Sequence, residues 1–150
     1  MTRIKWNRLR FPRLAGIRVS RGSERGQTLV EFALILPVML LMLFALVDFG
    51  RAFYTWLLVT NAAREGARVA ATQQGTTAVQ TRINDALGGL DAAELSITLT
   101  NVQGPRGEAV EVDLEYNFVF VTPVGNILTL VSGGTLDTPA ITSHSSMRLE

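Results

Sequence analysis

The chain contains no cysteine and a single histidine among its 150 residues. Without cysteine, neither a disulfide framework nor a thiolate metal site can form. The histidine, His144, stands in a stretch rich in serine and threonine, and neighbouring side chains of a strand point to opposite faces. We therefore expect His144 to face solvent rather than to pair with an adjacent serine. The glycines match no phosphate-binding pattern, so the sequence predicts no catalytic, cofactor-binding or metal site.

Acidic residues are almost missing from the first 25 residues. This segment carries eight Lys or Arg and only Glu24, a balance of +7, whereas the rest of the chain carries six Arg and twelve acidic residues, a balance of −6. A basic arm is compatible with nucleic-acid binding. Its place directly before an apolar run favours the positive-inside arrangement instead, with no nucleic acid as partner. Residues 1–26 are therefore predicted to be a basic cytoplasmic leader, either disordered or lying on the inner leaflet.

Charges are also scarce in the next segment, which reads GQTLVEFALILPVMLLMLFALV over residues 26–47. Eleven of the 16 residues in 32–47 are Leu, Ile, Val or Phe. These contribute roughly −3 to −7 kcal/mol to insertion, against about +2.5 to +3.5 kcal/mol for an acid at mid-helix. A signal peptide would end in a small-residue cleavage site, and none follows Val47. The sequence predicts a transmembrane helix at 27–47, in which the membrane environment tolerates Pro37.

The only charge inside this run is the carboxylate of Glu31. A lone carboxylate at the edge of a bilayer is costly. Thr28 and Glu31 have the spacing of a capping box, which would place the start of the helix at Thr28 and the acid near its positive end. A capping box does not explain why Gly26 marks the junction between the basic and the apolar segments.

Helical character continues beyond the bilayer, over residues 48–75. Asp48 and Arg51 are three residues apart and are predicted to pair at the outer interface, with Tyr54 and Trp56 as interfacial aromatic residues. We expect Gly75 to end the helix. Small residues recur further along this helix at helical spacing, and such a stripe lets another element approach closely. These residues are Ala63, Gly66, Ala67 and Ala70.

Residues 76–150 are predicted to form a small α+β domain with about three antiparallel strands, whose thin core the projecting helix helps to cover. The expected elements are helices at Thr77–Leu87 and Val124–Val131 and strands at Leu95–Leu99, Val110–Phe120 and Thr138–Leu149. The middle strand carries carboxylates at alternate positions, Glu111, Asp113 and Glu115. A cation site would explain them no better than a solvated outer face, which we prefer.

Several motifs in one order carry a resemblance to a known family. Residues 25–32 (RGQTLVEF) resemble the processing site of type IV pilin-like precursors, and residues 25–71 resemble the TadE-like pseudopilins, or minor pilins, of tight-adherence (Flp) pilus systems. The shared motifs are the Gln-Thr-Leu-Val-Glu-Phe opening, Leu36-Pro37, Asp48-Phe49-Gly50-Arg51 and the stretch from Asn61 to Arg68. Major Flp pilins usually have tyrosine after the glutamate and little globular domain. Phe32 and the sizeable domain argue against a main filament subunit.

The resemblance implies a processing site and a set of partners. In such precursors a membrane peptidase cuts after the glycine, here Gly26, so that Gln27 becomes the new N-terminus and Glu31 the fifth residue of the mature chain. In the family, the freed amine of a neighbouring subunit is thought to neutralise this glutamate. The resemblance therefore implies that an amine neutralises Glu31 and sets the register between two subunits. The implied partners are a prepilin peptidase, other pilin or pseudopilin subunits, the secretion platform and the membrane.

The resemblance also implies a location. We expect a single-pass protein of the bacterial inner membrane, with its N-terminus in the cytoplasm and its domain outside, or incorporated into an extracellular pilus. A second hypothesis is an uncleaved, membrane-anchored module for binding or adhesion. A third, a membrane-tethered enzyme, is disfavoured by the missing catalytic constellation.

Overall fold

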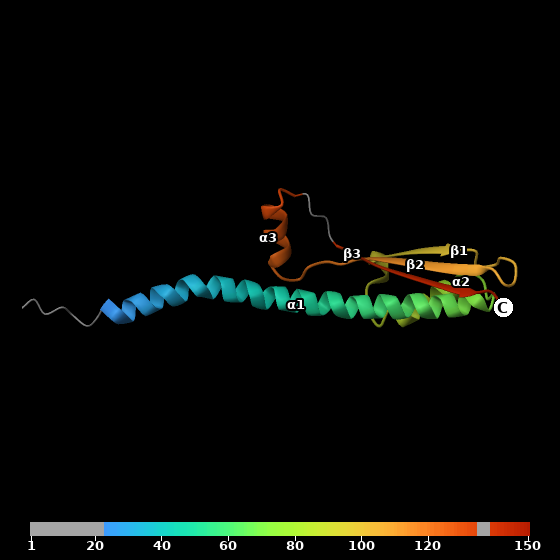
Figure 1. Cartoon of the computed structure of the whole chain (residues 1–150), viewed down its shortest axis with the longest axis horizontal. Helices are drawn as coiled ribbons and strands as arrows, with labels where there is room; N and C mark the ends of the chain where they lie inside the picture. The colour runs from blue at the N-terminus through green and yellow to red at the C-terminus, as the bar shows by residue number, and fades with distance from the viewer. Residues whose placement is uncertain (1–22, 135–138) are drawn as a thin grey trace, which may run out of the picture. The chain divides into compact units, whose positions relative to one another are not determined.

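The computed structural model describes residues 23–134 and 139–150 (Figure 1). The described residues form α1 (Ser23–Ala71), α2 (Thr76–Ala86), the short 3-10 helix η1 (Ala92–Glu94), β1 (Leu95–Thr100), β2 (Ala109–Asn117), α3 (Val124–Val131) and β3 (Ala140–Arg148). Most of the predicted basic leader, residues 1–22, and the predicted start of the last strand at Thr138 lie outside the described residues. The chain divides after Pro37 into two units, and each is described by itself.

Helix α1 continues without interruption through Pro37. From Gly26 onward it contains a stretch long and apolar enough to cross a membrane, and the described chain leaves the side chains of that stretch uncovered. Uncovered Leu, Ile, Val and Phe side chains suit a lipid environment, because hydrocarbon solvates them and the helix satisfies its own backbone. The predicted long apolar helix is therefore confirmed.

The ends of α1 differ from the prediction. The helix already includes Ser23, so Thr28 lies inside it and the interpretation of Thr28 as an N-cap was wrong. One glycine, Gly26, costs a helix only about 1 kcal/mol and does not end it. At the other end α1 stops at Ala71, since Gln73 adopts a left-handed conformation with φ of 56°. Gly75, which we expected to end α1, instead precedes α2 with φ of 85°.

The three strands form one antiparallel sheet in the order β1-β2-β3. Leu95 of β1 lies opposite Tyr116 of β2, and Val110 of β2 lies opposite Met147 of β3. The predicted α+β fold, a long apolar helix followed by a small domain with three antiparallel strands and short helices, is confirmed.

Strand β2 ends at Asn117, three residues earlier than the pattern predicted. The backbone N–H of Phe118 still donates to the carbonyl of Pro139, but Pro139 has no N–H with which to continue the ladder. Beyond this point Val121 N–H donates to Asp48 of α1 instead of to a strand. The chain therefore leaves the sheet and runs towards α1.

The core lies between one face of the sheet and the helices α1 and α2. Figure 1 shows the sheet along the C-terminal part of α1. Buried core residues come from α1 (Val59, Ala62, Ala63, Ala67, Ala70), from α2 (Val79, Ile83), from the residue after it (Leu87) and from β2 (Val110, Val112, Leu114, Tyr116). The alternation of β2 places the four apolar residues on one face, and this apolar burial drives the docking of the sheet on the helices.

Candidate functional site

The predicted processing motif lies on the N-terminal part of α1. Among the described residues, no atom beyond the two chain neighbours and the helix backbone lies within 4 Å of the position that a Cβ on Gly26 would take. Gln27 Nε2 donates a hydrogen bond to Glu31 Oε1 at 3.1 Å, and both side chains are exposed. The side chain of Phe32 is also exposed. The four residues Gly26, Gln27, Glu31 and Phe32 therefore form an open surface on one stretch of helix.

A second cluster centres on Asp48, which is only 2% exposed. Thr122 Oγ1 donates a short hydrogen bond to Asp48 Oδ2, and Val121 N–H donates to Oδ1 at 3.2 Å. Arg51 Nη1 lies 3.6 Å from the same Oδ1. Burial of an unpaired carboxylate would be strongly unfavourable, and these three contacts compensate for the lost hydration.

The side chain of Arg51 extends the cluster to the end of β2. Its Nη1 donates to the carbonyl of Val119 at 3.2 Å, and its guanidinium carbon lies 5.3 Å from the centroid of the Phe118 ring. The spacing of Asp48 and Arg51 predicted that they would pair. The contacts to residues 118–122 carry no signal in the sequence, because they join positions about 70 residues apart. Together they fasten the start of α3 to α1.

The stripe of small residues on α1 packs inside the domain. Ala63, Gly66, Ala67 and Ala70 are buried. A Cβ on Gly66 would come within 2.6 Å of Ile83 Cγ1 in α2 and 3.5 Å of Val112 Cγ1 in β2. The elements that approach this stripe are therefore α2 and β2 of the same chain.

An ion-pair cluster joins α1 and α2 at the surface. Glu65 Oε2 accepts from Arg68 Nη2 at 3.0 Å and from Arg82 Nη2 at 3.1 Å. The hydrogen bond from Arg68, and next that from Arg82, hold the pKa of the Glu65 carboxyl below its usual value. Arg82 was not singled out from the sequence, since its partner lies 17 residues away.

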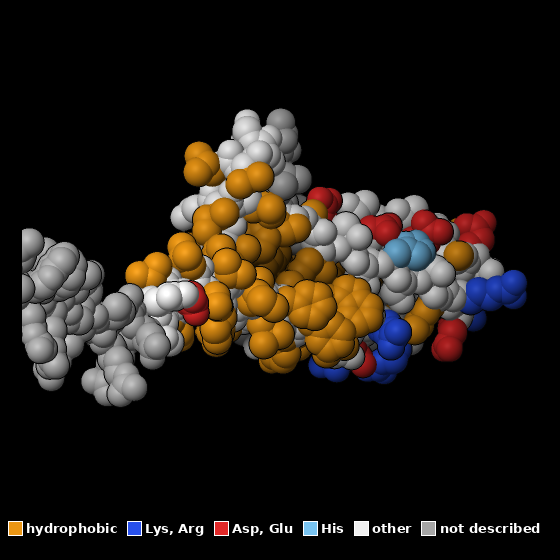
Figure 2. Space-filling model, turned by 60° about the vertical axis from the view of Figure 1, so that its left-hand side comes forward, with side chains coloured by type: hydrophobic (Ala, Val, Ile, Leu, Met, Phe, Trp, Pro, Cys, Tyr) orange, Lys and Arg blue, Asp and Glu red, His pale blue; other side chains and the backbone are white. Residues whose placement is uncertain are grey.

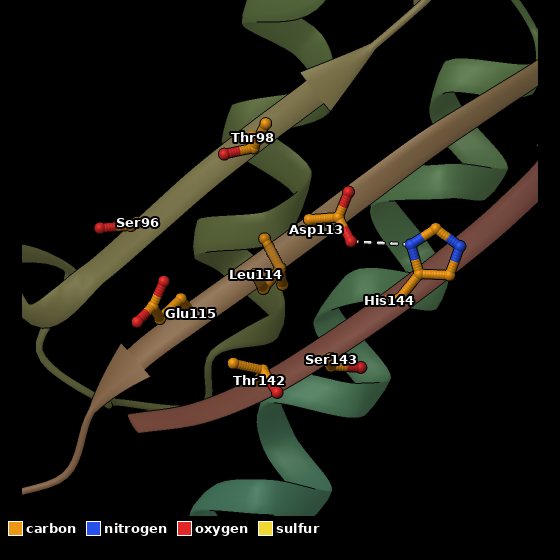
Figure 3. Close-up of a pocket in the computed structure, with 8 residues that line it drawn as sticks. All are labelled: Ser96, Thr98, Asp113, Leu114, Glu115, Thr142, Ser143 and His144. Atoms are coloured by element: carbon orange, nitrogen blue, oxygen red, sulfur yellow. Dashed lines mark hydrogen bonds and ion pairs between the residues drawn. The ribbon is translucent and has the colours of Figure 1, made fainter. Parts of the chain in front are cut away.

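The face of the sheet that looks away from the helices has a shallow hollow of about 260 Å³ (Figure 3). His144 Nδ1 lies 2.7 Å from Asp113 Oδ1, its direct neighbour across the two strands. His144 is exposed, as predicted, and Ser143 lies on the other face of β3. Ser96, Thr98, Leu114, Glu115, Thr142 and Ser143 complete the lining.

In this hollow the ring of His144 pairs with the carboxylate of Asp113. The two serines beside His144, Ser143 and Ser145, alternate to the other face of β3. Within the described part of the chain, no three His, Asp or Glu side chains converge as metal ligands. The hollow is an open surface lined mainly by polar residues.

Comparison with known protein families shows a match over much of α1. Residues 26–68 match the family model of the TadE-like proteins. The resemblance predicted from the motifs is thus confirmed over a segment that begins at Gly26 and includes Glu31 and the Asp48–Arg51 pair. Ala70, the sheet and α3 lie outside the matched segment. No curated protein and no solved structure matches the chain.

Proposed function

We propose that this TadE-like chain is a membrane-inserted pseudopilin, a minor-pilin-like structural component in the assembly of a tight-adherence pilus. The observation that carries the proposal is the family match, which begins at Gly26, the residue after which we expect a prepilin peptidase to cut. The open surface of the processing motif supports it, because both a peptidase and neighbouring subunits need access to these side chains.

Cleavage after Gly26 gives Glu31 a physical role. Among the described residues, the neutral amide of Gln27 donates a hydrogen bond to Glu31 and brings no positive charge to the carboxylate. A cut converts the backbone nitrogen of Gln27 into a protonated amine, and an amine of this kind from a neighbouring subunit would neutralise Glu31. Such a buried pair contributes little net stability but fixes the register of the two helices.

The charge pattern supports a defined orientation. The basic residues before Gly26 stay in the cytoplasm and the acidic domain after Val47 lies outside the inner membrane. The partners in this proposal are the prepilin peptidase, other pilin or pseudopilin subunits and the tight-adherence secretion platform. The chain performs no catalysis and uses no cofactor, in keeping with a structural family.

A test uses the replacement Glu31→Ala in a host with the complete pilus system. The variant is expected to insert into the membrane like the wild type but to be lost several-fold from the sheared pilus or assembly-complex fraction. Asp85→Ala, which removes an exposed carboxylate on α2, serves as the matched control and should assemble normally. Normal incorporation of Glu31→Ala would overturn the role of Glu31.

The alternative is an uncleaved, membrane-anchored binding or adhesion module. The observation that favours it is the open polar hollow with its His144–Asp113 pair, which faces away from the helices. This alternative predicts that Glu31→Ala changes little, whereas replacement of His144 and Asp113 abolishes attachment.

A further inference from the structure

Helix α3 exposes apolar side chains that the domain does not cover. Leu130 and Val131 are 83% and 80% exposed, and Val119 and Val121 before the helix are 55% and 70% exposed. Figure 2 shows hydrophobic side chains gathered over α3 and the adjoining part of α1. A continuous exposed apolar surface of this kind marks a binding face.

One side of α3 is apolar and the opposite side is not. At 100° per residue, Val124, Ile127, Leu128, Leu130 and Val131 fall on one side of the helix. Gly125, Asn126 and Thr129 fall on the opposite side. No charged residue occurs from Tyr116 to Leu136. With 8 residues the helix is about 12 Å long, too short to cross a bilayer but suited to lying in its interface.

The level at which α3 lies relative to the predicted membrane span of α1 indicates what covers its apolar side chains. Asp48 directly follows Val47, the last residue of the apolar run, and Asp48 binds Thr122 and Val121 just before α3 begins. The residues just before α3 are thus bound to α1 at the point where α1 leaves the predicted bilayer. Exposed aromatic side chains follow on α1 at Phe49, Phe53, Tyr54 and Trp56. Aromatic residues concentrate at membrane interfaces.

We propose that α3, with residues 118–123 before it, is an interfacial helix that lies in the headgroup region of the bilayer crossed by α1. Lipid is the occupant because the apolar surface of α3 continues that of the membrane-spanning part of α1. The hydrogen bonds to the carboxylate of Asp48 hold the helix at that depth. The proposal rests on the membrane insertion of α1 in the proposed function, but not on processing or pilus assembly.

The absence of cysteine permits single-cysteine labelling of the full chain. Leu130→Cys, Met42→Cys and Thr98→Cys are each labelled with an environment-sensitive nitrobenzoxadiazole dye and reconstituted into phosphatidylcholine–phosphatidylglycerol liposomes. Met42 lies in the predicted span and Thr98 lines the polar hollow of the sheet. Quenching by spin-labelled lipids and by aqueous iodide is then measured for each site.

We expect the dye at position 130 to be quenched by lipids labelled near the headgroup and to show a several-fold lower iodide quenching constant than the dye at position 98. Equal iodide access at positions 130 and 98, with position 42 in lipid, overturns the interfacial helix and leaves the membrane anchor intact. Protection at position 130 that disappears on dilution of protein in lipid identifies a second copy as the cover and also overturns it. Position 42 outside the lipid overturns both proposals.

A paired replacement tests the face of α3. The dye is placed at Val131→Cys in combination with Leu130→Asp or with Thr129→Asp. The first charge lies on the apolar side and the second on the polar side of the helix. Protection from iodide should be lost with Leu130→Asp and retained with Thr129→Asp. The same response to both replacements contradicts the orientation proposed here.

Discussion

Asp48 shows how one residue joins distant parts of the chain. It is nearly completely buried, and its carboxylate accepts hydrogen bonds from Thr122 and Val121 while Arg51 approaches from one helical turn away. When polar groups are buried, removal of one leaves the hydrogen-bonding groups of its partners unsatisfied. The cluster is therefore expected to act as a unit.

Asp48→Ala should release the segment that follows β2. The replacement leaves the Val121 N–H and the Thr122 hydroxyl without their acceptor, at a cost of about 1–3 kcal/mol. The amide of Val121 should then exchange with solvent about tenfold faster or more, since 1.4 kcal/mol corresponds to a factor of ten. Hydrogen exchange of the full chain in nanodiscs measures this rate.

Arg51→Ala is the matched control for this cluster. The Arg51 side chain is 46% exposed, and an ion pair of such a residue contributes about 0–1 kcal/mol. The effect of Arg51→Ala on exchange at Val121 should be clearly smaller than that of Asp48→Ala. Equal effects would show that the contacts of Arg51 with Asp48, Val119 and Phe118 hold the segment as strongly as the two hydrogen bonds to Asp48.

Gly66 shows how closely α1 and α2 approach. A Cβ at this position would come within 2.6 Å of Ile83 Cγ1, and Ile83 is fully buried. Overpacking of this kind costs about 1–3 kcal/mol, more than the gain of up to about 1 kcal/mol in helix propensity. Gly66→Ala should therefore lower the free energy of unfolding, measured by chemical denaturation of the full chain in detergent.

Two variants check the cause of this effect. Gly50→Ala meets no atom within 4 Å beyond the helix backbone and should be neutral or stabilising. In an Ile83→Ala background the clashing atoms are gone, so Gly66→Ala should no longer destabilise. An undiminished cost of Gly66→Ala in that background would exclude the contact with Ile83 as its cause.

At the scale of elements, the ion-pair cluster of Glu65 fastens α2 to α1 in a pH-dependent way. The pKa of Glu65 is lowered in the folded chain, first by Arg68 and then by Arg82. A lowered folded pKa contributes stability that is present above the unfolded value of about 4.3 and is lost as the pH falls through the folded value. The stability advantage of the wild type over Glu65→Gln should shrink on acidification below about pH 4.

Thermal unfolding of both proteins across this range measures the difference. Above about pH 5 the carboxylate is ionised in both states, so the difference should stay constant there. A difference that grows on acidification would contradict the assigned direction of the pKa shift.

The elements themselves follow from local sequence patterns. The apolar run between Thr122-Pro123 and Gly133-Gly134 predicted α3 at Val124–Val131, as observed, and all three strands were predicted, the first two from alternation. The errors lie at element ends. Strand β2 stops before Phe118 because Pro139 interrupts its partner, and α1 stops before Gln73 rather than at Gly75. These stops depend on a residue from another strand and on a left-handed residue other than glycine, neither of which a local pattern reveals.

The candidate sites were predictable only where their residues lie close together in the sequence. The side chains of the processing motif and the Asp48–Arg51 pair are local, so spacing brings them together. The contacts of Asp48 with Thr122 and of Glu65 with Arg82 depend on how the domain folds back on α1. The same folding back explains why the small-residue stripe is covered by α2 and β2 of its own chain.

At the scale of the whole molecule, the chain combines a membrane-length helix with a small domain whose core includes part of that helix. The docking of α2 and the sheet occupies the small-residue stripe of α1. The processing motif around Glu31 remains uncovered by the described residues of its own unit, and in the proposed function it is a surface for subunit contacts. The proposed pseudopilin role therefore depends on whether the mature chain begins at Gln27.

The most direct test is the N-terminal sequence and intact mass of the chain after co-expression with the cognate prepilin peptidase, with the major pilin as positive control for cleavage. We expect a mature chain that begins at Gln27 and has lost residues 1–26. An intact chain that still begins at Met1, in a sample where the major pilin is cut, would contradict the proposed function.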